Sequence, residues 1–225
     1  MSIDIVFQHQ DFIVVNKPIG LGVHSEHGQA GIVPILCEQL ALPKLWLAHR
    51  LDKVTSGLLI LAKNAKAAAY FGELFTEHKI QKYYLAIGTK KPKKKQGAIV
   101  GDMRKIRDGK WALSTEKSNP ARTQFFSKPI DNGQRLFILK PLTGKTHQLR
   151  VAMKSLGSPI LGDSLYKGET SDRVYLHAFK LAFEYNNEPF SLSTMPNDKS
   201  QFDQLHLHDA FKQFAEPQEL AWPKV

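Results

Sequence analysis

The chain has 225 residues, of which 42% are hydrophobic and 10% aromatic, and this composition excludes a disordered protein. Its 31 lysines and arginines exceed its 21 acidic residues, which gives a net charge of +10. A single cysteine, Cys37, excludes an intramolecular disulfide and a cysteine-based metal cluster, and it favours a reducing, cytoplasmic compartment. The longest apolar run, 58–62, is too short to span a membrane, and the N-terminus lacks the pattern of a signal peptide.

Short apolar runs separated by turn signals predict a series of strands. These runs cover residues 3–8, 12–16, 58–62, 82–87, 122–127, 135–141 and 175–183. Helical spacing of apolar residues predicts one helix that begins after Asn64 and ends near His78, and a second over about 145–156 with Gly157 as its stop. The pattern as a whole predicts an α+β protein with a substantial antiparallel sheet.

The positive charge is concentrated between Lys79 and Lys154. This segment holds 19 basic and 4 acidic residues, whereas the rest of the chain has a net charge of −5. Clustered cations favour a polyanionic partner because phosphates release their counterions on binding, so nucleic acid is the first candidate. The alternatives are a lysine-rich surface that serves solubility and, less favoured, an anionic membrane. Within this segment, residues 89–118 predict a protruding excursion or hairpin.

Several known motifs are incomplete in this sequence. Gly144, Lys145 and Thr146 resemble the end of a phosphate-binding loop, but Leu139 stands where that loop needs a glycine. The pair Gly20 and Gly22 lacks the third glycine of a dinucleotide site. The nine histidines form no known metal-binding pair. The sequence therefore predicts no cofactor and no metal.

An arginine and an aspartate stand in a turn-rich loop directly before a buried strand, in the segment HRLDKVTSGLLILAK at 49–63. Loops held by a rigid sheet are common places for active residues. Asp52 could equally cap the turn through the amides of Thr55 and Ser56, so the spacing alone leaves a catalytic and a structural carboxylate both open.

Four further blocks, in this order along the chain, resemble those of the RluA-type pseudouridine synthases. They are DFIVVNKPIGLGVH (11–24), QKYYLAI (81–87), LTGKTHQLRVAMKSLGSPILGDSLY (142–166) and LHAFKLAF (176–183). Lys145 and Ser158 depart from the arginine and histidine that are usual in the family. The resemblance implies a pseudouridine synthase fold, with a central mixed, mostly antiparallel sheet, flanking helices and an RNA-binding cleft. It also implies the isomerisation of a uridine in RNA without a cofactor.

The resemblance implies three catalytic residues. Asp52 would be the essential carboxylate, acting either as a nucleophile on the ribose or as a base that removes a ribose proton. Tyr84 would stack on the flipped uracil and relay the proton from its carbon 5. Strand alternation directs the neighbouring Tyr83 to the opposite face, as a core residue. Arg150 would keep the Asp52 carboxylate charged and oriented.

The remaining expected site residues contact RNA. Arg50 either binds the RNA backbone or fills the space left by the flipped base, whereas His49 is expected to pack or hydrogen-bond within its loop. Arg150 shares a helix face with His147 and Lys154. The residues expected to bind RNA are Arg50, Lys82, Lys93, Lys94, Lys95, Arg104, Lys105, Lys145 and His147.

Residues 1–190 are expected to form the catalytic domain, with the basic insertion at about 89–118, and 191–225 a C-terminal extension packing on the same domain. The extension is expected to contain a helix over 200–214 and a loose end over 216–225. Because the first block starts by Ile3, no N-terminal accessory domain is expected.

The expected partner is ribosomal or transfer RNA, bound by a monomer without a protein partner. The sequence leaves the RNA and the uridine open. The alternatives are a non-catalytic RNA-binding module on the same fold, and a nuclease or nucleoside hydrolase that uses Asp52.

Overall fold

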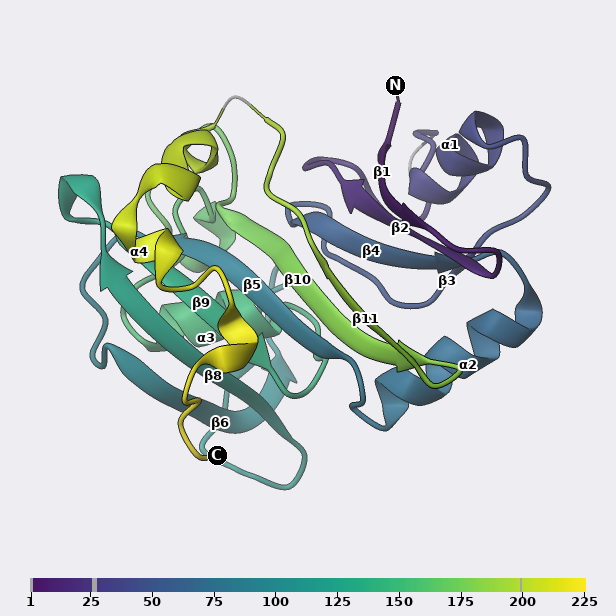
Figure 1. The fold of residues 1–225 in the computed structure, drawn as a ribbon. Helices are drawn as coiled ribbons and strands as arrows, with labels where there is room; N and C mark the ends of the chain where they lie inside the picture. The colour runs from purple at the N-terminus through teal and green to yellow at the C-terminus, as the bar shows by residue number, and fades with distance from the viewer. Residues whose placement is uncertain (1, 26–27, 199) are drawn as a thin grey trace. The chain divides into compact units, whose positions relative to one another are not determined.

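The computed structural model describes residues 2–25, 28–198 and 200–225. The chain divides into two compact units (Figure 1). Unit 1 consists of Met1–Gln81 and His177–Pro196, and unit 2 of Lys82–Leu176 and Asn197–Val225. Within the described residues, no helix has the length and apolar character that crossing a membrane requires.

Unit 1 is built on a mixed sheet (Figure 1). Its strands are β1 (Asp4–Gln8), β2 (Phe12–Lys17), β3 (Trp46–Leu47), β4 (Ser56–Ala62), β10 (Leu176–Tyr185) and β11 (Glu188–Ser193). The order is β1-β2-β4-β10-β11, and β3 also pairs with β4. The pair β4 and β10 is parallel, and the other pairs are antiparallel. The strands predicted from the sequence in this unit are therefore confirmed, with ends that differ by one or two residues.

Two helices belong to unit 1, α1 (Ile32–Gln39) and α2 (Ala65–Thr76). The predicted helix after Asn64 is confirmed as α2, because the Asn64 side chain accepts a hydrogen bond from the Ala67 amide at 2.9 Å. Ala67, Phe71 and Leu74 recur on one face of α2 and belong to the hydrophobic core of this unit. Helix α1 was not predicted, because it is only eight residues long and has no side-chain cap.

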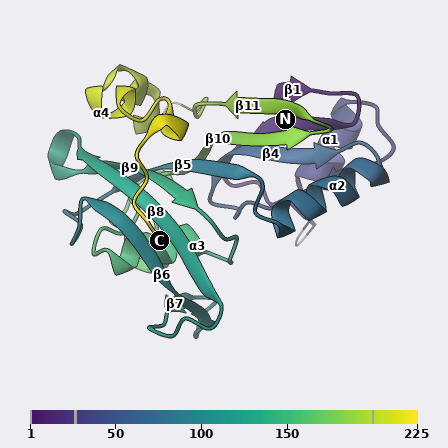
Figure 2. The same ribbon diagram turned by 60° about the horizontal axis from the view of Figure 1, so that its bottom comes forward.

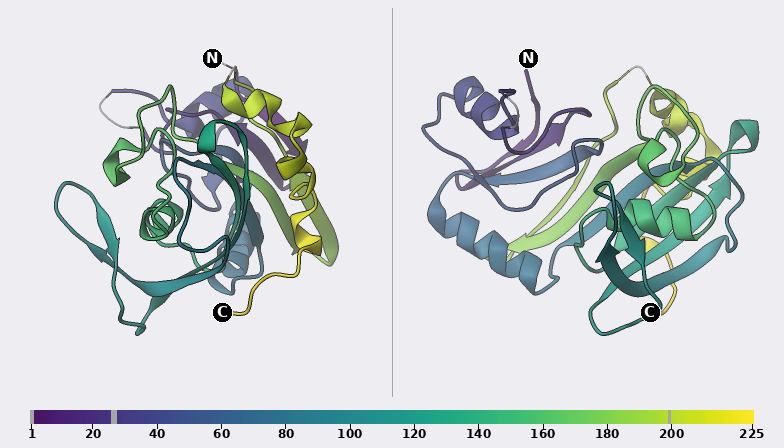
Figure 3. Two further views of the ribbon diagram at one scale, coloured as in Figure 1. Left: turned by 90° about the vertical axis from the view of Figure 1, so that its left-hand side faces the viewer. Right: turned by 180° about the vertical axis from the view of Figure 1, so that it is seen from behind.

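Unit 2 contains an antiparallel sheet and the helix α3 (Gln148–Ser155) (Figure 2). Its strands are β5 (Gln81–Gly88), β6 (Gln96–Lys105), β7 (Trp111–Leu113), β8 (Pro120–Pro129) and β9 (Arg135–Pro141). One 3₁₀ turn, Asp131–Gly133, lies between β8 and β9, and another, Ser164–Tyr166, follows α3. The order is β5-β9-β8-β6-β7. The predicted excursion contains the hairpin of β6 and β7, which reaches outward as the teal arm in the left view of Figure 3. Both units together give the predicted α+β class.

Helix α3 is shorter than the predicted helix over 145–156. It begins at Gln148, because His147 has a left-handed backbone with φ 55°. The Gln148 side chain instead closes the preceding turn by accepting hydrogen bonds from the Lys145 amide and the Thr143 hydroxyl. Gly157 follows with φ 77°, which confirms the predicted glycine stop.

The C-terminal segment differs from the sequence prediction in two ways. Instead of one helix over 200–214, it forms a 3₁₀ helix, Gln201–Leu207, and the short α4 (Asp209–Lys212). His208 between them is extended and caps α4 through its ring nitrogen, which stops a continuous helix. The predicted loose end is also wrong, because after a 3₁₀ turn at Pro217–Glu219 the Trp222 ring packs beside Tyr83 and Phe126.

Candidate active site and RNA interface

The loop that carries Asp52 lies in unit 1, between β3 and β4. Its turn is closed by the main chain, since the Thr55 amide donates to the Asp52 carbonyl at 2.9 Å. The loop that follows β2 also contacts this turn, since the Gly20 amide donates a hydrogen bond to the Lys53 carbonyl at 2.9 Å. The Asp52 side chain is half-buried, and Arg50 is exposed. The main-chain bonds therefore give this acidic side chain a defined position at the surface of unit 1.

Two histidines fix the ends of this loop. His49 accepts a hydrogen bond from the Ile60 amide at 3.1 Å and its ring lies 4.6 Å from that of Phe75, which is the packing role expected from the sequence. His177 on β10 lies 2.8 Å from the Ser56 hydroxyl, and its other ring nitrogen lies 2.9 Å from the Thr194 carbonyl. Because a carbonyl only accepts, Nε2 of His177 carries the proton and Nδ1 accepts from Ser56.

His177 escaped the sequence analysis because its partner Ser56 lies 121 residues away along the chain. The neighbouring residues of β4 and β10 also approach closely, which explains why a glycine is required at the start of β4. Gly57 has φ 111°, and a Cβ there would lie 2.3 Å from the Ala178 carbonyl oxygen. The Asp52 loop therefore enters β4 at a point where two strand backbones approach closely.

Tyr84 lies on β5 in unit 2. The adjacent Tyr83 is fully buried and its ring lies 5.9 Å from that of Trp222, so Tyr83 is the core residue, as alternation predicts. Tyr84 is 9% exposed and its side chain points to the other face of the strand. Lys82, on that same face, is 7% exposed, and burial lowers its pKa. The stacking role of Tyr84 and the RNA contact of Lys82 remain predictions.

Arg150 on α3 has a partner that the sequence did not reveal. Its Nε and Nη2 donate to the two carboxylate oxygens of Asp163 at 2.8 and 2.7 Å. The predicted common helix face is confirmed for Arg150 and Lys154, which both lie over the Tyr166 ring. It is wrong for His147, which precedes the helix, although its Nδ1 lies 2.8 Å from the Tyr166 hydroxyl. The pairing of Arg150 with Asp52 remains a prediction. Asp163 stands in the GDSLY segment, but nothing in that pattern points to Arg150.

Five of the cations expected to bind RNA lie on the loop between β5 and β6 and at the end of β6 in unit 2. Lys93, Lys94 and Lys95 are exposed, and the Lys93 amide donates to the Leu156 carbonyl at 2.9 Å, which ties their loop to the end of α3. Arg104 and Lys105 are exposed at the end of β6. Lys145 is half-buried and donates to the Asn119 side chain at 2.9 Å.

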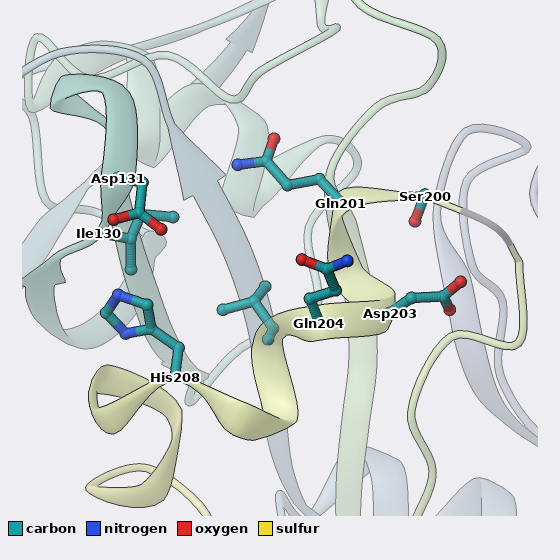
Figure 4. A pocket seen from close by; sticks show the side chains of 8 residues that line it. Ile130, Asp131, Ser200, Gln201, Asp203, Gln204 and His208 are labelled. Carbon is teal, nitrogen blue, oxygen red and sulfur yellow. The ribbon is translucent and has the colours of Figure 1, made fainter.

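A separate cavity of about 370 Å³ in unit 2 contains none of the predicted site residues. Figure 4 shows the Asp131 and Asp203 carboxylates among its lining side chains, together with His208 and Gln201. Two carboxylates repel phosphate, so this cavity does not fit an RNA backbone. Among the residues that the structure describes, no group of three histidine, cysteine or acidic side chains could hold a metal ion.

Residues 11–155 match the family described as RNA pseudouridylate synthase. The chain therefore belongs to this family and is an RNA-modifying isomerase. It is 58% identical over 199 residues to an RNA pseudouridine synthase of Haemophilus influenzae, covering 88% of this chain and 89% of the relative. It is 34% identical over 195 residues to the dual-specificity RNA pseudouridine synthase RluA of Escherichia coli strain K12, covering 80% of this chain and 86% of the relative.

The structure of the human RNA pseudouridylate synthase domain containing 4 superposes with a TM-score of 0.74 at 29% identity. The match covers 91% of this chain and 92% of the human chain. Together with the family match, this superposition confirms the predicted pseudouridine synthase fold.

Proposed function

We propose that this pseudouridine synthase isomerises specific uridines in ribosomal or transfer RNA, with Asp52 as its catalytic carboxylate. The supporting observation is the loop of Asp52, whose turn is closed by main-chain bonds and whose entry and exit are held by His49 and Ser56. A rigid loop keeps the carboxylate within a narrow range of positions, which is what attack on a bound nucleotide requires.

The reaction conserves every atom of the uridine. The bond from ribose to ring nitrogen 1 breaks, the uracil turns, a bond forms to carbon 5, and the proton on carbon 5 moves to nitrogen 1 through general acid–base groups. Asp52 starts the cleavage, either by attacking the ribose, in which case its ester bond breaks as carbon 5 bonds the ribose, or by removing a ribose proton, which it returns once that bond has formed. Tyr84 stacks on the extruded uracil, and its hydroxyl relays the carbon 5 proton. Arg150 keeps the Asp52 carboxylate charged and oriented.

The exposed cations on the β5–β6 loop and at the end of β6, namely Lys93, Lys94, Lys95, Arg104 and Lys105, bind the RNA backbone in this proposal. Neutralising Lys93, Lys94 and Lys95 together lowers RNA affinity and its salt dependence. The slope of log affinity against log salt concentration becomes shallower by about 0.9 for each duplex phosphate that these lysines no longer neutralise. A triple replacement of the exposed Lys44, Lys66 and Lys212 is the control with the same change in net charge. Equal salt slopes for the two triple variants would remove the RNA role from Lys93–Lys95.

Residues 1–190 act as the catalytic domain in this proposal, and 191–225 as an extension of it. The enzyme works as a cytoplasmic monomer. A reducing compartment fits the single Cys37.

The test uses cells that lack the gene, complemented with the wild type, Asp52→Ala or Asp4→Ala. Asp4 is an exposed aspartate on β1 and serves as the control. Pseudouridines are mapped in total RNA by carbodiimide-dependent stops of primer extension. We expect a stop that the wild type and Asp4→Ala restore and that Asp52→Ala does not, and its position names the RNA.

Four other outcomes contradict the proposal in distinct ways. RNA binding without any changed position favours the non-catalytic binding module. Chain scission indicates a nuclease, and free uracil indicates a nucleoside hydrolase. A stop that Asp52→Ala restores would show that another group performs the chemistry.

A further inference from the structure

Helix α3 and the hairpin of β6 and β7 are joined by one buried hydroxyl, that of Tyr166. The Tyr166 side chain is fully buried. Its oxygen accepts a hydrogen bond from the Trp111 amide at 3.0 Å and lies 2.8 Å from Nδ1 of His147. Trp111 is the first residue of β7, and His147 is the residue that precedes α3. Because Trp111 pairs with Lys105, the last residue of β6, the phenol connects the turn end of the cationic hairpin to the N-terminus of the helix that carries Arg150.

The Arg150 guanidinium is held by two side chains from the same short segment. Asp163 binds it through two oxygens, with side-chain exposures of 6% for the arginine and 1% for the aspartate. The Tyr166 ring lies beneath it, with its centroid 5.0 Å from the guanidinium carbon. A bidentate pair fixes the plane of the guanidinium, and the ring prevents it from tilting toward that side. Arg150 thus has a fixed direction before any RNA binds.

We propose that Asp163 and Tyr166 are positioning residues of the pseudouridine synthase reaction, which set the Arg150 guanidinium and link it to the RNA-binding hairpin. This inference rests on the proposed function, in which Arg150 orients the catalytic carboxylate. Because both side chains are buried, neither offers a surface for RNA. Their loss is therefore expected to slow the chemical step and to leave RNA affinity nearly unchanged.

Tyr166→Phe is the sharper variant, because it removes only the hydroxyl and keeps the ring under Arg150. Tyr175→Phe is the matched control in the same unit. The Tyr175 hydroxyl also accepts from a main-chain amide, that of Gln201 at 3.1 Å, and also bonds one side chain, Asp172 at 2.8 Å. Each variant thus removes one hydrogen bond from a main-chain amide and one contact with a polar side chain. Of the two tyrosines, only Tyr166 adjoins Arg150.

The measurement is the single-turnover rate of pseudouridine formation together with the dissociation constant of the same RNA. We expect Tyr166→Phe to lower the rate by about tenfold or more, since a small misplacement of a catalytic group has effects of this size. Its RNA dissociation constant should stay within about twofold of the wild type, and Tyr175→Phe should match the wild type in both.

A second pair of variants tests the carboxylate. Asp163→Asn should lower the rate on the order of 100-fold, and Asp163→Glu should recover part of it, because the longer side chain restores the charge opposite Arg150. If Asp163→Asn does not fold, the comparison of Tyr166→Phe with Tyr175→Phe decides alone.

If the wild type forms pseudouridine but Tyr166→Phe and Tyr175→Phe have equal rates, the inference is overturned and the proposed function still stands. Loss of RNA affinity without loss of rate would also overturn it, because it would make Tyr166 a binding residue. A wild-type protein that forms no pseudouridine would refute the proposed function and this inference with it.

Discussion

Removal of the Asp163 charge should strongly destabilise unit 2. Asp163→Asn keeps the shape of the side chain but takes away the negative charge that binds the Arg150 guanidinium, which is only 6% exposed. Water does not reach the site to replace that charge, so most of the interaction is not recovered. The expected consequence is a lower free energy of unfolding, independent of any effect on catalysis.

The magnitude follows from the burial of the pair. Removing one partner of a buried ion pair costs about 3–5 kcal/mol, whereas an exposed pair contributes about 1 kcal/mol or less. Asparagine still offers one oxygen to one guanidinium N–H, so we expect a loss near the lower end, about 3 kcal/mol. With a urea dependence of about 2–3 kcal/mol per M, the unfolding midpoint should fall by roughly 1–1.5 M.

The assay is urea unfolding followed by tryptophan fluorescence and by circular dichroism. The matched control is Asp209→Asn, which breaks the Asp209–Lys212 pair of 2.8 Å, whose side chains are 85% and 64% exposed. We expect its midpoint to stay close to that of the wild type. Replacing both Asp163 and Arg150 by apolar residues should restore part of the stability, because neither charge of the pair is then buried. If Asp163→Asn shifted the midpoint no more than Asp209→Asn, the buried-pair reasoning would be refuted.

Three further predictions concern unit 1. Burial and the hydrogen bond to Asp11 raise the pKa of Tyr185 to about 12. The contribution of this tyrosine to stability should therefore be complete below pH 10 and lost between about pH 10 and 12. In urea midpoints measured across that range, Tyr185→Phe should show a smaller loss than the wild type. Phe12→Ala should cost about 3–5 kcal/mol in the same assay, because its fully buried ring contacts Phe71 and other aromatic rings. Asn64→Ala should cost about 1 kcal/mol by removing the cap of α2, and thermal unfolding that matches the wild type would contradict the capping role.

Most strands, and the helix after Asn64, could be predicted from the sequence because their signals are local. A short apolar run between turn signals specifies a strand, and a capping side chain three residues from its amide specifies a helix start. The two-residue period of a strand put Tyr83 and Tyr84 on opposite faces, and the likeness to the family then selected Tyr83 as the core residue. The Asp52 loop, by contrast, was recognised by its likeness to a family, since its spacing fitted a structural turn equally well.

The failures have two physical causes, which are competing local hydrogen bonds at the start of α3 and a partner distant in the chain at the C-terminus. The helical spacing over 145–156 was real, but the Gln148 side chain bonds the preceding turn and the left-handed His147 starts the helix late. The sequence predicted a loose end over 216–225, yet Trp222 packs beside Tyr83, which lies on a strand far earlier in the sequence.

The sequence by itself determined the class of fold, the segregation of positive charge and the family, because composition, periodicity and ordered motifs are properties of the chain alone. Only the tertiary structure decided which groups hold the predicted site residue Arg150 and the end of the Asp52 loop, as with Asp163 on Arg150 and His177 on Ser56. A hydrogen bond or buried ion pair depends on atoms within about 3 Å of each other, and that proximity arises only when segments apart in sequence pack together.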